Sequence, residues 1–277
     1  MKINSSIIKG LVLAVAVLAA IYFPGSTSAS HSWGGYHWAR TANPFTLKVG
    51  NNVSSAWLGD YNTALSDWTQ SSVMNMSSIA GSGGKQCRLV SGTVQVCNRT
   101  YGNNGWLGLA SINITGGVHI TQGSAKMNDT YFNTSTYNNP NERLHVMCQE
   151  IGHTFGLDHQ STDGSSQNTC MDYFSNTGVN AGSTLSTHPN QHDYDELVTI
   201  YTHLDSFTTL AFTASASNPY VDEDASENWG RLVSQSANGR STTYERENWD
   251  GTKKATHVYW TLETAAVCRA CDHRYDH

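Results

Sequence analysis

The chain has 277 residues, with 16 Lys and Arg against 22 Asp and Glu, which gives a formal net charge of −6 at pH 7. This acidic balance, without a basic stripe, excludes a nucleic-acid-binding surface, because phosphate contacts need clustered Lys and Arg. The length suits one domain with an extension. We place the main domain at residues 31–210 and the extension at 211–277, and we expect a monomer.

Residues 1–30 are predicted to be a secretory signal peptide. Lys2 and Lys9 supply positive charge, an apolar run follows at 11–23, and small residues at 26–30 suit cleavage. The run is shorter than the roughly 20 residues of a membrane-spanning helix. Two of the sixteen Lys and Arg lie in this segment, so the mature chain keeps fourteen against twenty-two acids, a net charge of −8. We therefore expect a secreted protein without a membrane anchor, and a retained anchor is the alternative.

The first part of the mature chain predicts a strand, a helix and further strands. Phe45 to Val49 alternates apolar and polar residues with the period of a strand. Residues 53–70 carry large apolar residues at helical spacing. Further strands are predicted at 93–97, 105–115 and 118–128. This order favours an α+β fold, with a twisted mixed sheet and a backing helix.

Two histidines in these segments are interpreted as packing residues. His37 lies in a short aromatic leader, and His119 lies in a predicted strand. Either could bind a metal, but a histidine in such a place is more often a satisfied, half-buried side chain.

A helix predicted over 143–155 brings Gln149 and His153 onto one face, because residues four apart in a helix lie above one another. The chain can then turn back and bring His159 to the same place. His145 lies two turns from His153, about 12 Å along the axis, and cannot share a metal with it. From the residues alone, the group either holds a metal or forms a hydrogen-bonded polar cluster without one.

The stretch from Gln149 to His159, QEIGHTFGLDH, resembles the zinc signature of the metzincin metallopeptidases, HExxHxxGxxH, except that Gln149 replaces the first histidine. The later segment TCMDYF, with Met171 and Tyr173, is similar to the methionine turn beneath the metal in that family. The resemblance implies a Zn²⁺ ion held by His153 and His159. Gln149 would be a weaker third ligand, because zinc favours nitrogen and sulfur.

The resemblance also implies a function, a secreted metalloendopeptidase that cleaves protein or peptide substrates. Glu150 would be the general base, Tyr173 would stabilise the oxyanion, and Met171 would form the floor of the site. One of the strands at 105–115 and 118–128 would be the edge strand that holds an extended peptide by main-chain pairing. The alternatives are an inactive pseudopeptidase that binds without cutting, and an inert structural protein.

Six cysteines in an exported chain predict disulfides. Cys87 and Cys97 flank a short segment and suit a pinned hairpin. In the family fold the stretches that contain Cys148 and Cys170 pack together, which implies a bridge between them. A Cys148 nucleophile with His153 as its base is a poor alternative, because the two side chains point to different sides of the helix.

The C-terminal part predicts a closing helix from Asp193 to about Leu204. In the extension, Leu232-Val233 and residues 256–262 can pair as a hairpin that docks on the main domain. Cys268 and Cys271 can form a small zinc knot with nearby histidines, but a local disulfide or a disordered end is favoured over it.

Overall fold

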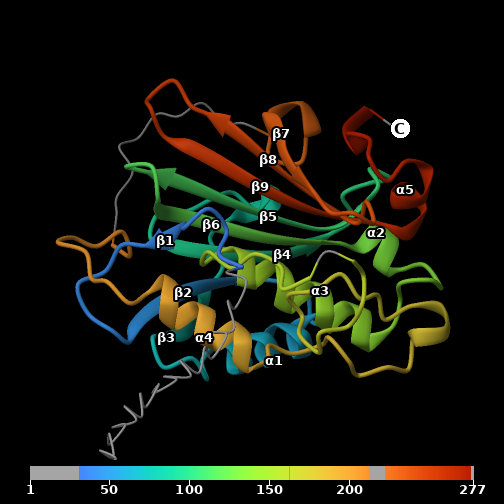
Figure 1. The fold of residues 1–277 in the computed structure, drawn as a ribbon, viewed down its shortest axis with the longest axis horizontal. Helices are drawn as coiled ribbons and strands as arrows, with labels where there is room; N and C mark the ends of the chain where they lie inside the picture. The colour runs from blue at the N-terminus through green and yellow to red at the C-terminus, as the bar shows by residue number, and fades with distance from the viewer. Residues whose placement is uncertain (1–30, 162, 212–221, 276–277) are drawn as a thin grey trace, which may run out of the picture.

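The computed structural model describes residues 31–161, 163–211 and 222–275, so the predicted signal peptide at 1–30 lies outside the described residues. The fold is α+β, with one large mixed sheet and a few helices (Figure 1). Among the described residues, no helix has the length and apolar character needed to cross a membrane.

The sheet has nine strands in the described part of the chain, in the order β3-β2-β4-β6-β5-β9-β8-β7, and β1 pairs with the start of β6. The strands are β1 (His37–Trp38), β2 (Phe45–Asn52), β3 (Met74–Ala80), β4 (Thr93–Arg99), β5 (Trp106–Thr115), β6 (His119–Asn128), β7 (Arg231–Gln235), β8 (Ser241–Glu247) and β9 (Lys253–Trp260). Neighbouring strands from β3 to β6 are parallel, and those from β6 to β7 are antiparallel. The predicted mixed sheet is therefore observed, and β3 was not predicted.

The α-helices are α1 (Leu58–Trp68), α2 (Asp129–Phe132), α3 (Pro140–His153), α4 (Gln191–Ile200) and α5 (Leu262–Val267). Figure 1 shows α1, α3 and α4 together on one face of the sheet. Helix α1 buries Tyr61, Leu65 and Trp68, a stripe with the helical period, and packs against α3. The apolar residues predicted over 53–70 therefore belong to the core between helix and sheet.

Helix α3 begins and ends at residues that fix its geometry. Asn139 is the N-cap, with its side chain accepting from the Glu142 amide, and Pro140 occupies the first turn. Beyond the helix, Gly156 has φ +99°, and a Cβ there would lie 1.9 Å from the Tyr36 carbonyl oxygen. A glycine is needed here, and the sharp turn sends the chain back toward the helix.

The described part of the predicted extension, residues 222–275, contributes strands β7, β8 and β9 to the same sheet, beyond β5. β9 pairs antiparallel with β5 from Trp106↔Trp260 to Ile114↔Lys253. The strands predicted at 105–115 and 118–128 therefore both have neighbours on both sides, and the prediction that one of them is the edge strand is wrong. β8 also lies between β7 and β9, so the two segments expected to pair directly do not.

Three disulfides are present, Cys87–Cys97, Cys148–Cys170 and Cys268–Cys271. The second ties α3 to the segment that contains Met171. A Cys148 nucleophile and a C-terminal zinc knot both need free thiols, and these bridges leave none at those positions.

Candidate metal centre

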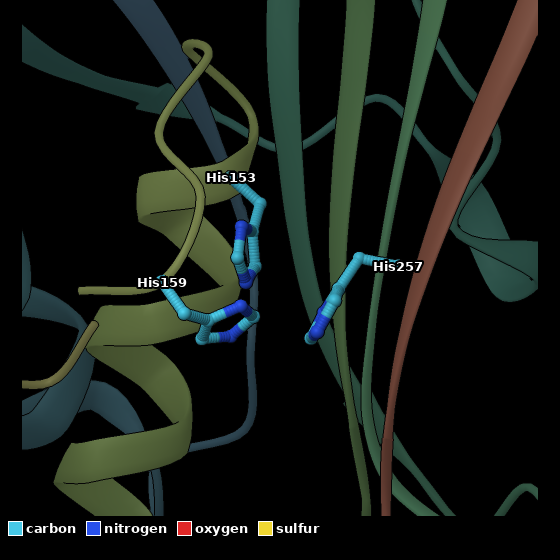
Figure 2. A group of neighbouring side chains, drawn as sticks. All are labelled: His153, His159 and His257. Carbon is cyan, nitrogen blue, oxygen red and sulfur yellow. The ribbon is translucent and has the colours of Figure 1, made fainter. Parts of the chain in front are cut away.

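Three histidines converge between α3 and the sheet, and we call them the three-histidine group: His153, His159 and His257. Each offers one nitrogen, and these atoms lie within 4.8 Å of one another. Figure 2 shows His153 and His159 on the helix side and His257 reaching them from β9. Their exposed fractions are 1%, 8% and 1%, so the group is buried.

Hydrogen bonds fix the rings of two of these histidines. His153 Nδ1 lies 2.8 Å from the Leu157 carbonyl oxygen. His159 Nδ1 lies 3.0 Å from a carboxylate oxygen of Asp158. Since both oxygens accept, the proton belongs on each Nδ1, and each Nε2 presents a lone pair. A hydrogen bond of this kind on the outer nitrogen is typical of metal-binding histidines.

Two of the inner nitrogens have no hydrogen-bond partner among the described residues, whereas His257 contacts Ser241 Oγ through Nε2 at 2.7 Å and Glu150 through Nδ1. His153 Nε2 and His159 Nε2 are both buried and make no hydrogen bond. A buried polar atom left unpaired costs about 1–3 kcal/mol. A metal ion in the middle of the group would pair both lone pairs, so the residues fit an ion.

Glu150 lies beside the group and is fully buried. Its Oε2 is 3.2 Å from His257 Nδ1, and its Oε1 has no partner among the described residues. Burial raises the pKa of this carboxyl, and His257 opposes the shift. A Cβ on Gly108 would lie 2.5 Å from Oε1, so only glycine at this point of β5 leaves room for the carboxylate.

Gln149, predicted as the third ligand, uses its amide nitrogen elsewhere. Nε2 donates to the carbonyl oxygens of Cys170 and Asp172 at 2.9 and 2.7 Å, and thereby holds the turn around Met171. Its Oε1 is buried without a partner among the described residues. The third imidazole of the group comes from His257 instead.

The remaining predicted residues lie around the three-histidine group. Met171 is buried beneath α3, where its sulfur would lie 2.6 Å from a Cβ on Gly152. The Tyr173 hydroxyl is 2.7 Å from His159 Nδ1, and burial raises the pKa of this tyrosine well above its usual value. His145 is separate from the group, as predicted, with its Nδ1 2.5 Å from the Ser186 carbonyl oxygen.

Sequence reasoning missed His257 because no motif marks it. It follows His159 at a long distance in the chain and lies in a segment interpreted as a hairpin strand. The available signal was its place in an apolar run, where a buried histidine needs partners.

The histidines make the metal-free protein sensitive to acid. Burial, and next the neighbouring His257, hold the pKa values of His153 and His159 well below the ordinary 6.5. Below pH 6.5 the unfolded chain binds protons that the folded chain does not, so stability falls as the pH falls. We expect the urea midpoint of chelator-treated protein to drop between pH 7.5 and pH 5.5. The drop in the midpoint should be smaller in His153→Gln than in the wild-type chain. In His188→Gln, which replaces a half-exposed histidine, the drop should equal that of the wild-type chain. An equal drop in the wild-type chain and both variants would contradict this.

The group has the chemistry of a transition-metal site. Imidazole nitrogens suit zinc and its neighbours, whereas calcium and magnesium prefer oxygen ligands. Three protein ligands that leave one position open are the pattern of catalytic sites. No protein-family model matches the chain, and a search of curated proteins finds no match. The functional interpretation therefore comes from the arrangement of these side chains.

Proposed function

We propose that this protein is a secreted zinc metalloendopeptidase with a metzincin-like fold, in which the three-histidine group holds Zn²⁺ and Glu150 is the general base. The observation that carries the proposal is a buried carboxylate beside converging imidazoles, two of which have unpaired inner nitrogens. The methionine-containing turn under α3 and the disulfide that ties it to the helix support the same interpretation.

The protein residues would divide the chemistry as follows. Zinc, when bound, supplies a nucleophilic water at neutral pH and polarises the scissile carbonyl. Glu150 takes a proton at its unpaired Oε1 and returns it to the leaving amine. Its raised pKa brings the carboxyl closer to the operating pH, where general acid–base catalysis is most effective. Tyr173 keeps its proton at neutral pH, so its hydroxyl can donate a hydrogen bond to the developing oxyanion.

In this structure, the three-histidine group is closed to a polypeptide substrate. A peptide that pairs with the β5 edge needs the main-chain groups that β9 already uses. The site residues are also at most 8% exposed. We infer that β9 must leave β5 before a peptide binds, and that His257 leaves the site with it.

Opening would leave His153 and His159 on the helix side. Gln149 Oε1 is then the buried oxygen that can take the vacated position, since it has no partner and lies one helical turn before His153. This exchange keeps the predicted role of Gln149, but only in the open state.

The second candidate is a pseudopeptidase that binds zinc in the same group and never opens. The pairing of β9 along β5 favours it, because a permanently covered site could not admit a peptide. The two candidates differ in whether zinc-loaded protein cleaves an unfolded protein substrate.

Metal analysis of the full chain tests the proposal. His257→Ala should weaken zinc binding by at least about 100-fold, since losing even an outer-shell partner of a ligand costs 10–100-fold. His188→Ala is the matched control, because the His188 imidazole is half exposed, pairs with Asp67 and is not part of the three-histidine group. Cleavage of an unfolded protein that chelator abolishes and zinc restores would support the peptidase. Zinc binding that is equal in His257→Ala and the control would rule out this ligand set.

A further inference from the structure

A second group of metal-ligand atoms lies outside the three-histidine group and shares no residue with it. His37 on β1 meets His203 and Asp205, which follow α4. One atom from each lies within 4.8 Å of the others. We call these residues the His37–His203–Asp205 group.

The separations of these atoms match the edges of a tetrahedral metal site. Bonds of 2.0–2.1 Å to zinc place two tetrahedral ligands about 3.4 Å apart. His37 Nε2 is 3.1 Å from His203 Nε2 and 3.7 Å from Asp205 Oδ1. The third edge, from His203 Nε2 to the same oxygen, is 3.9 Å. All three edges therefore lie within about 0.5 Å of the tetrahedral value, and the His203 side chain is 53% exposed.

Surrounding hydrogen bonds aim the ligand atoms at one point. His37 Nδ1 lies 2.8 Å from the Gly35 carbonyl oxygen, which puts the proton on Nδ1 and leaves Nε2 free to bind an ion. Arg40 occupies the other carboxylate oxygen, Oδ2 of Asp205, at 3.0 Å. Oδ1 is thereby turned toward the histidines, and His119 Nε2 approaches it at 3.2 Å.

Without an ion, the pairing within the group depends on one tautomer of His203. The facing Nε2 atoms of His37 and His203 form a good hydrogen bond only if His203 carries the proton on Nε2, because the Nε2 of His37 is a bare acceptor. An ion would instead satisfy both lone pairs and the carboxylate oxygen together.

We propose that His37, His203 and Asp205 form a second metal site that takes a divalent transition-metal ion, with zinc favoured by the two imidazoles and one carboxylate. The site joins strand β1 to the segment that follows α4. A bound ion therefore stabilises the folded chain by linking these two segments, which are far apart in the sequence. Exposure of His203 gives the ion a path from solvent.

Zinc equivalents in the full chain, measured after dialysis by mass spectrometry, test the second site. His203→Ala should lower the count by one equivalent, whether or not the three-histidine group is occupied. Because His203 and His188 are equally exposed, His188→Ala is a matched control and should keep the wild-type count. His257→Ala reports separately on the first group, so the two proposals fail independently.

A second readout separates a metal site from a purely structural one. Added zinc should raise the melting temperature of the control more than that of His203→Ala. His203→Gln keeps a donor opposite His37 Nε2 but loses the imidazole, and should behave like His203→Ala. Equal zinc counts and equal zinc-induced shifts in His203→Ala and His188→Ala would overturn the proposal.

Discussion

Glu150→Gln is expected to lower the rate of peptide cleavage by about 10²–10⁴-fold, the usual contribution of a general acid–base group. Glutamine has the same shape but cannot accept the proton that Oε1 is positioned to receive. The zinc content at saturating zinc should stay unchanged, since Glu150 is not one of the three ligands and the amide oxygen of glutamine can still accept from His257 Nδ1. The measurement is the initial rate on an unfolded protein, together with metal analysis of the same sample.

Glu142→Gln is the control for changing a buried carboxylate on the same helix. Glu142 is also fully buried on α3, and it accepts hydrogen bonds from Ser175 and the Asn176 amide. Any loss of activity there reports only on packing around α3. Equal losses in Glu142→Gln and Glu150→Gln would contradict a catalytic role for Glu150.

A disulfide between β5 and β9 is expected to abolish cleavage of protein substrates while leaving zinc binding intact. Ser111 and Thr256 face each other in register, with their hydroxyl oxygens 3.2 Å apart, so Ser111→Cys with Thr256→Cys can form a bridge. The bridge keeps β9 on β5, so that His257 stays in the site and β5 cannot pair with a peptide. The rate is compared between samples in which mass spectrometry shows the bridge formed.

A disulfide between β5 and its other neighbour, β6, is the matched control. Asn113 on β5 pairs with Gln122 on β6, so Asn113→Cys with Gln122→Cys adds a disulfide without holding β9. This variant should keep its activity. Full activity in the Ser111–Thr256 double variant would mean that substrate does not enter between β5 and β9.

The sequence predicted helix α3 and the turn after it, because the signals for both are local. Gln149 and His153 are spaced by one helical turn, and the turn at Gly156 needs a backbone that only glycine adopts readily. Strand alternation likewise predicted β2, since Phe45, Leu47 and Val49 are buried there.

The sheet side was not predictable in the same way, because it depends on pairing between distant segments. Nothing local in β9 indicates that it pairs with β5 and brings His257 to α3. The same holds for the second group, where His37 meets residues that follow α4. β3 was missed because only Met74 of this strand is buried, which leaves a weak alternation.

Anomalous diffraction at the zinc absorption edge, from crystals of the zinc-loaded full chain, tests the central claim most directly. The account predicts a peak among His153, His159 and His257, with the Glu150 carboxylate beside it. The account would be contradicted if no peak lay between these three imidazoles at saturating zinc and they contacted only protein atoms or water.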